Sequence, residues 1–210
     1  MSESSLRERM VLLGKSLFDR GYVHGSSGNL SARLDDGFLV TPTNSCLGML
    51  DPARIAKVDF SGAHLSGDKP SKEAFLHLGV YEIRPEAQAV AHSHSTHSVA
   101  LSCLEHEKTE DVLPPVTAYA VMKVGKLPLL PYYRPGDRKL ADAVREVSAK
   151  HSALLLAHHG PVVAGKSPED AVWSLEELEE TAKLVFLLEG RPHARLTLEQ
   201  MRELNEVFPS

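Results

Sequence analysis

The sequence predicts an α/β protein in which helices cover a mixed or largely antiparallel sheet. Short apolar segments of strand length recur along the chain, and most of them are joined by turns. Helical segments are interspersed among them, which is typical of a sheet packed between helical layers. With 210 residues, of which 42% are hydrophobic, the chain can bury one substantial core. We therefore expect a single domain that spans residues 1–210.

The elements of the first half follow from local signals. Residues 3–20 carry apolar residues at helical spacing and stop at Gly21, a good helix C-cap. Residues 35–37 are typical of a hairpin turn, and Ser71 stands where a helix N-cap belongs. The predicted elements are a helix over 3–20, hairpin strands over 29–34 and 37–42, a helix over 72–83, a strand over 88–94 and a short helix over 95–104.

The second half is predicted in the same way. Asp137 lies near the start of an amphipathic helical segment, and Pro168 occupies the first turn of a long helix, where proline is favoured. The predicted elements are short β segments over 121–125 and 127–131, a helix over 135–150, paired strands over 153–160 and 161–165, a helix over 167–190 and a last helix over 196–208.

Composition and charge exclude several classes of partner. The formal charge of −5 and the pI near 6.1 argue against nucleic-acid binding, which would need a basic stripe. The first ten residues lack the apolar core of a signal peptide, and no apolar run reaches membrane length. The two cysteines are too few for a disulfide framework. We therefore expect a cytoplasmic protein with neither a nucleic-acid nor a membrane partner.

Two histidine clusters stand at the ends of predicted strands. His92 and His94 are two residues apart, so an extended strand projects both from the same face. His158 and His159 end another apolar run, where neighbours point to opposite faces and only one can face a shared site. Together the two strands could supply three imidazole ligands to a divalent metal with an open position, the catalytic arrangement of zinc. The alternative is a pair of polar strand ends with solvated imidazoles.

Glu73 and three groups of small polar residues are the other candidates. Glu73 falls in the first turn of a predicted helix, where the helix dipole stabilises a carboxylate, and this is the alternative to a catalytic role. Ser71 and Lys72 could hold an anion at the same helix N-terminus. The loop over 25–31 offers backbone donors and hydroxyl groups, and residues 41–44 are similar in character. Either loop could also be an ordinary turn.

Other polar residues receive less specific interpretations. His97 is expected to be a hydrogen-bonding partner rather than a metal ligand. The acidic run over 176–180 predicts a solvated helix face, and Arg134 could meet an anion across a subunit boundary. Surface positions are expected for the remaining histidines: His24, His64, His77, His106, His151 and His193.

Five motifs, in this order and spacing, resemble the class II aldolase family, which includes L-fuculose-phosphate aldolase. They are GSSGN, TPTN, PSKE, HSHSTH and HHG, and the resemblance spans roughly residues 5–190. It implies a single α/β domain with a central, mainly antiparallel sheet covered by helices on both faces. It also implies a homotetramer with sites at subunit interfaces.

The resemblance further implies roles for individual residues. Zn²⁺ is expected on His92, His94 and His159, with Glu73 as an acid/base carboxylate that can also ligate the metal. The family's ligand directly precedes the glycine, which selects His159 over His158. Substrate-binding roles are expected for Ser26, Gly28, Asn29, Thr43, Asn44, Ser71 and Lys72. Lys72 and Asn44 depart from the fuculose-type aldolases, which have serine and glycine there, and this weakens the transfer of aldolase activity.

Within the family, the chain is most similar to enzymes that decarboxylate a 3-oxo-tetronate 4-phosphate, a small phosphorylated sugar acid. The expected reaction is zinc-dependent loss of CO₂ through a metal-stabilised enediolate, which Glu73 protonates to give dihydroxyacetone phosphate. The alternative is a class II sugar-phosphate aldolase, which forms the same enediolate but expels an aldehyde. A non-catalytic interaction module on the same fold, as in the adducin head, is disfavoured by the retained glutamate and histidines.

Overall fold

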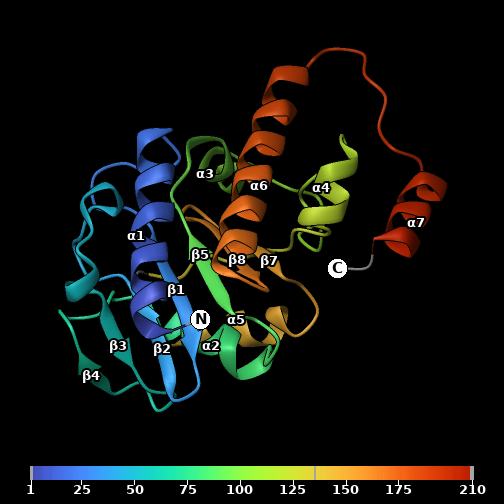
Figure 1. Cartoon of the computed structure of the whole chain (residues 1–210). Helices are drawn as coiled ribbons and strands as arrows, with labels where there is room; N and C mark the ends of the chain where they lie inside the picture. Colours follow the sequence, from blue (N-terminus) through green and yellow to red (C-terminus); the bar gives the residue numbers. More distant parts are fainter. Residues whose placement is uncertain (1, 135, 209–210) are drawn as a thin grey trace.

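The computed structural model describes residues 2–134 and 136–208. Its centre is a mixed sheet with strand order β4-β3-β2-β1-β5-β8-β7-β6, in which only the β6–β7 pair is parallel (Figure 1). The strands are β1 Asn29–Leu34, β2 Gly37–Val40, β3 Ala56–Val58, β4 His64–Ser66, β5 Ala89–His92, β6 Leu129–Leu130, β7 Ala153–Leu156 and β8 Gly160–Gly165. The expected fold class, a mainly antiparallel sheet between helices, is confirmed.

Helices lie on both faces of this sheet. They are α1 Glu3–Asp19, α2 Ala74–Ile83, α3 Thr96–Cys103, α4 Ala118–Lys123, α5 Lys139–Ser148, α6 Pro168–Leu188 and α7 Leu198–Val207, with 3-10 turns at Leu47–Met49 and Pro52–Arg54. Figure 1 shows α1, α3 and α6 in front of the sheet, and α2 and α5 behind it. α7 packs on α4 and lies away from the sheet.

Two apolar clusters fill the spaces between the sheet and its two helical layers. Alternate residues of one strand enter opposite clusters: Ala91 packs with α1 and α6, whereas Val90 packs with α2 and α5. β7 shows the same alternation, with Leu155 on the first side and Leu154 on the second. A strand that is buried on both faces has a nearly continuous apolar sequence, which is why these segments carry so few polar residues.

The long helix α6 begins where the sequence predicted. The Ser167 hydroxyl accepts a hydrogen bond from the Asp170 amide, and Pro168 occupies the first turn. The helix then packs across β5 and β8, which are neighbours in the interior of the sheet. This packing matters for the site, because β5 ends at His92.

Several predicted elements were wrong in type or extent. Residues 121–125 were expected to be a β segment, but 121–123 belong to α4, whose N-terminus is capped by Thr117. β3 and β4, three residues each, were missed. The predicted strand over 153–160 ends at Leu156. Pro135, the first residue of the predicted helix over 135–150, lies outside the described residues, and that helix begins at Lys139.

In the described part of the chain, no helix is both long and apolar enough to cross a membrane.

Candidate active site

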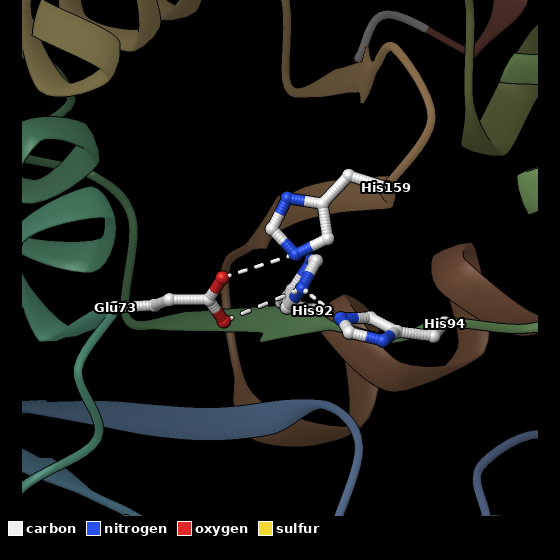
Figure 2. Close-up of side chains that lie close together, drawn as sticks. All are labelled: Glu73, His92, His94 and His159. Atoms are coloured by element: carbon white, nitrogen blue, oxygen red, sulfur yellow. Dashed lines mark hydrogen bonds and ion pairs between the residues drawn. The ribbon is translucent and has the colours of Figure 1, made fainter. Parts of the chain in front are cut away.

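Four side chains from three distant parts of the chain converge at one end of the sheet. Glu73 precedes the first residue of α2, His92 ends β5, His94 follows it, and His159 lies in the turn between β7 and β8 (Figure 2). One ligand atom from each residue lies within 4.8 Å of the others. The structure thus brings together the four residues expected to bind a metal, and His159 rather than His158 joins the group.

The potential ligand atoms of this cluster face each other. Nε2 of His92 lies 3.1 Å from Nε2 of His94 and 3.5 Å from Oε2 of Glu73. Nε2 of His159 lies 3.0 Å from Oε1 of Glu73. The three imidazole rings meet edge to face, with centroids 4.8–5.0 Å apart. Figure 2 shows all four side chains pointing toward one common point.

A backbone contact fixes the tautomer of His92. Its Nδ1 donates to the carbonyl of Pro161 on β8, at 2.8 Å. Nε2 therefore carries the lone pair and directs it into the cluster. A second ring nitrogen bonded to a backbone carbonyl is the usual way in which proteins orient a metal-ligating histidine. Only a neighbouring strand can supply this carbonyl, and β8 pairs directly with β5.

Two glycines allow the backbone to pack closely around the end of β5. A Cβ atom on Gly28 would lie 2.7 Å from the carbonyl oxygen of His92, and one on Gly160 would lie 2.2 Å from that of Ser93. Both glycines also have positive φ angles, 77° and 150°. Any larger residue would push the neighbouring segments away from His92 and His94. The glycines of GSSGN and HHG are thus needed for the geometry of the cluster.

Burial favours the neutral form of His92 and His94. Desolvation lowers the pKa of His92, and it lowers the pKa of His94 to about 3. Burial by itself would raise the pKa of Glu73. The electrostatic interaction with His92 and the hydrogen bonds from His159 and Asn29 outweigh this and lower that pKa below its ordinary value. Neutral imidazoles and an ionised carboxylate are the protonation states that a divalent cation requires of its ligands.

The residues fit a mononuclear divalent metal. In a tetrahedral site with metal–nitrogen bonds of about 2.0–2.1 Å, ligand atoms are separated by about 3.3 Å. The 3.1 Å between the His92 and His94 nitrogens and the 3.0 Å between His159 and Glu73 are close to this value. Three histidines and one carboxylate are also a donor set that suits zinc and several other divalent transition metals.

A chain of buried hydrogen bonds leads from Glu73 into the protein. Asn29 Nδ2 donates to Oε2 of Glu73 at 2.8 Å, and Asn29 Oδ1 contacts Nε2 of His77. Nδ1 of His77 lies 2.7 Å from the Ser31 hydroxyl, which lies 2.7 Å from the Tyr81 hydroxyl. The expected surface position of His77 was therefore wrong. The residue is 0% exposed and lies in the middle of this hydrogen-bond network.

The expected anion-binding loops meet beside the cluster. The Leu30 amide donates to the Thr41 hydroxyl, and the Ser71 amide donates to the Thr41 carbonyl. The Ser71 hydroxyl accepts from the amide of Glu73. Ser71 is not the N-cap as predicted: the N-cap is Glu73, and α2 begins at Ala74, two residues later than expected. These contacts bring together the loops that carry the expected substrate-binding residues, of which Ser26, Asn44 and Lys72 are exposed, Gly28, Thr43 and Ser71 are half-buried, and Asn29 is buried.

A cavity of about 410 Å³ opens beside the cluster. His94 and His159 form part of its wall, together with His24, Val99, Tyr132, Tyr133 and His158. His158 has a positive φ angle of 56°, a strained backbone that turns its ring away from the cluster toward Tyr132. His24 and His158 are exposed and lie at the mouth of the cavity, so the first of them is a surface residue as expected.

His97 and Glu179 hold the segment that follows the ligands. His97 is not part of the cluster, and its Nδ1 lies 2.8 Å from Oε1 of Glu179, so its expected hydrogen-bonding role is confirmed. Glu179 also accepts bonds from the amides of His97 and Ser98 and from the Ser98 hydroxyl. The acidic run over 176–180 is therefore not a solvated face throughout, because Glu179 is buried and caps α3.

The fold and the cluster define a single-domain α/β protein in which three histidines and one glutamate, a group that could hold a metal ion, lie beside a cavity. Residues 8–186 match the Class II Aldolase and Adducin N-terminal domain family. The chain belongs to this family, as the ordered motifs of the sequence implied.

Individual relatives narrow the comparison. The chain is 54% identical over 203 residues to the 3-oxo-tetronate 4-phosphate decarboxylase of Escherichia coli O6:H1, covering 96% of both chains. It is 35% identical over 208 residues to the L-fuculose phosphate aldolase of Haemophilus influenzae, covering 96% of this chain and 93% of the relative. The crystal structure of YgbL from Klebsiella pneumoniae is 48% identical and superimposes with a TM-score of 0.95 over 97% of this chain and 99% of that one. The protein is an enzyme, a carbon–carbon lyase.

Proposed function

We propose that the protein is a zinc-dependent decarboxylase that converts a 3-oxo-tetronate 4-phosphate into dihydroxyacetone phosphate and CO₂. The observation that carries this proposal is the convergence of Glu73 with three imidazoles beside a cavity. The relative that is 54% identical over nearly the whole chain is named for this reaction. At 35%, the aldolase relative is considerably less similar.

In this proposal His92, His94 and His159 hold the metal, and Glu73 lies against it. When bound, a divalent cation supplies Lewis-acid stabilisation of the negative charge that develops on the substrate oxygens. Three uncharged ligands leave the charge of the cation undiminished for this purpose. The hydrogen bond that Nδ1 of His92 donates to the Pro161 carbonyl holds this ring in place before substrate arrives. The ring therefore needs little movement during the reaction.

Glu73 is the proposed proton carrier. Loss of CO₂ breaks the C1–C2 bond and leaves an electron pair that delocalises from C2 onto the C3 oxygen. The net reaction consumes one proton, which Glu73 takes up from water at a carboxylate oxygen and delivers to C2. A positioned acid or base of this kind contributes about 10²–10⁴-fold to the rate.

The substrate phosphate is proposed to lie among the three loops next to Glu73. Gly28, Asn29, Thr43, Asn44 and Ser71 are its proposed contacts, with Ser26 and Lys72 at the exposed edge. Backbone amides and hydroxyls at the start of α2 favour an anion there. Lys72 is assigned to the phosphate or an oxyanion, because neutralising the departing carboxylate would stabilise the ground state and slow the loss of CO₂.

The experiment that tests the proposal measures products. Purified protein is incubated with a 3-oxo-tetronate 4-phosphate and, separately, with L-fuculose 1-phosphate, each with and without a chelator. We expect chelator-sensitive release of CO₂ and dihydroxyacetone phosphate from the first substrate. Release of an aldehyde from the second, with no CO₂ from the first, would instead establish the aldolase alternative. Zinc is tested against manganese and cobalt by restoring the chelated protein with each metal.

Two further properties belong to this proposal. We propose a homotetramer, as the resemblance implies. Leu198, Val207 and Phe208 are exposed apolar residues on or next to α7, which packs on α4. Their exposure is consistent with coverage by a neighbouring subunit. Light scattering after size-exclusion chromatography tests the oligomeric state. A cytoplasmic location stays a prediction from the sequence.

A further inference from the structure

His77 lies in a buried network that the proposed reaction does not yet use. The network runs from the Tyr81 hydroxyl through Ser31, His77 and Asn29 to the carboxylate of Glu73. Glu73, at the N-cap of α2, is followed at intervals of four residues by His77 and Tyr81 on the helix, so the three project from one side of it toward β1. Ser31 and Asn29 are two apart on β1, so they face the helix together.

The direction of every hydrogen bond in this network can be deduced by starting from the carboxylate of Glu73. An ionised carboxylate only accepts hydrogen bonds, so Asn29 must turn its NH₂ group toward Glu73 and its carbonyl toward His77. The carbonyl oxygen of Asn29 also only accepts, so Nε2 of His77 must carry a proton and donate it.

The remaining bonds follow from this tautomer. A neutral imidazole protonated at Nε2 has its lone pair on Nδ1, so Nδ1 accepts from the Ser31 hydroxyl. Ser31 then accepts from the hydroxyl of Tyr81. Burial favours the neutral imidazole, because desolvation lowers the pKa of His77 to about 3. Every donor in the network therefore points toward Glu73.

We propose that His77 is a positioning residue for the reaction: its Nε2–H holds the Asn29 amide in the one orientation that donates to Glu73. This inference rests on the proposed function, since it assigns the group that keeps the proton carrier in place. Asn29 is 4% exposed, so water does not compete effectively for its carbonyl. A flipped Asn29 would set its oxygen against the carboxylate of Glu73, acceptor against acceptor, and its NH₂ group against a donor.

The network also links the two halves of the site. An amide nitrogen has two protons, and only one of those on Asn29 is used by Glu73. The second is available to the substrate phosphate, for which Asn29 is a proposed contact. One amide, oriented by His77, can thus serve both the proton carrier and the substrate.

Two substitutions at position 77 separate positioning from simple support of the fold. His77→Gln keeps an N–H donor at about the place of Nε2, whereas His77→Leu fills a similar volume without one. We expect kcat of the Leu variant to fall about 10–100-fold, the usual range for residues that orient a catalytic or metal-binding group. We expect the Gln variant to stay within about threefold of the wild type.

Stability controls accompany this pair. Val124→Ala, at the C-terminal end of α4 and buried in the apolar cluster on the opposite face of the sheet from α2, is expected to lower the melting temperature without altering the network. It should leave kcat unchanged. The proposal fails if kcat of His77→Leu stays within threefold of the wild type. It also fails if the losses in kcat of all three variants follow their melting temperatures.

A substrate-free measurement completes the test. In ¹⁵N NMR of histidine-labelled protein, the signals lost in His77→Gln identify the His77 ring, and their shifts report which nitrogen carries the proton. We expect Nε2 to be protonated and Nδ1 bare. A bare Nε2 would overturn the proposal whatever the substrate is. If the wild type releases no CO₂, the decarboxylase assignment fails by itself, and the variants are compared by aldehyde release instead.

Discussion

The two sides of the site are held in different ways. On the metal side, His92 is completely buried, its ring is fixed by Pro161, and Gly28 and Gly160 let the backbone pack around it. On the substrate side, Ser26, Asn44 and Lys72 are exposed to solvent. In the proposed mechanism, the buried and fixed residues are therefore those near which charge changes, whereas the loops proposed to hold the phosphate carry exposed side chains. Preorganised groups lower a barrier most at the reacting atoms.

The largest effect is expected from removing a metal ligand on the buried side. His92→Ala and His159→Ala should lower both metal content and kcat/KM by more than about 100-fold. Substitution of a residue that only hydrogen-bonds to a metal ligand costs up to about 100-fold, and loss of a ligand should cost more. Elemental analysis of the purified variants gives the metal content. His193→Ala, an exposed histidine, is the matched control and should keep both values. Full metal content in His92→Ala would show that the cation lies elsewhere.

The next effect concerns Glu73, which joins the two sides. Glu73→Gln has the same shape but cannot carry a proton between water and carbon, so kcat should fall about 10²–10⁴-fold. The three imidazoles are unchanged, so zinc should remain bound. Glu86→Gln, a half-exposed position just beyond the other end of α2, serves as control. Normal turnover by Glu73→Gln would remove the proposed proton carrier from the mechanism.

On the substrate side, a hydroxyl deletion should act mainly on binding. Ser71→Ala removes a proposed donor to the phosphate, and a hydrogen bond to a charged group contributes about 1.5–3 kcal/mol. KM should therefore rise about tenfold or more, while kcat changes much less. Steady-state kinetics beside Ser66→Ala, an exposed serine on β4, measures this. A drop in kcat at constant KM would place Ser71 with the reacting groups instead.

The last expected effect is on stability rather than on activity, and it depends on pH. The unfolded chain binds a proton on His77 below pH about 6.5, whereas the folded protein does so only near pH 3, because burial lowers this pKa to about 3. Unfolding is therefore favoured as pH falls through this window, by at most about 1.4 kcal/mol per pH unit, and the stability is fully present above it. Urea titrations of chelated protein should show a weaker dependence for His77→Gln. Equal slopes would contradict the contribution of His77.

These expectations also show what the sequence could reveal. His92, His94 and His159 were predictable because each stands at or just after the end of an apolar strand segment, and strands of one sheet bring such ends together. The strand itself ends at His92, so the simple alternation argument does not reach His94. The choice of His159 over His158 came from the family motif, and the structure explains it by the strained turn at His158.

Other residues escaped the sequence because their partners are distant. His77 contacts residues 46 and 48 positions earlier in the chain, and nothing near it in sequence marks it as buried. The spacing of Glu73, His77 and Tyr81 at intervals of four was the available signal. Glu179 was hidden in an acidic run, although it lies on the helix side that carries Leu175 and Ala182. Residues 121–125 were mistaken for a strand because so short an apolar run has no decisive periodicity.

The central claim is that three imidazoles and one carboxylate hold a single catalytic cation. Anomalous diffraction at the zinc edge, from crystals of zinc-loaded protein, tests it most directly. The account predicts one strong peak about 2.0–2.2 Å from Nε2 of His92, His94 and His159, with Glu73 beside it. A peak bound elsewhere, or zinc held by fewer than three of these histidines, would contradict it.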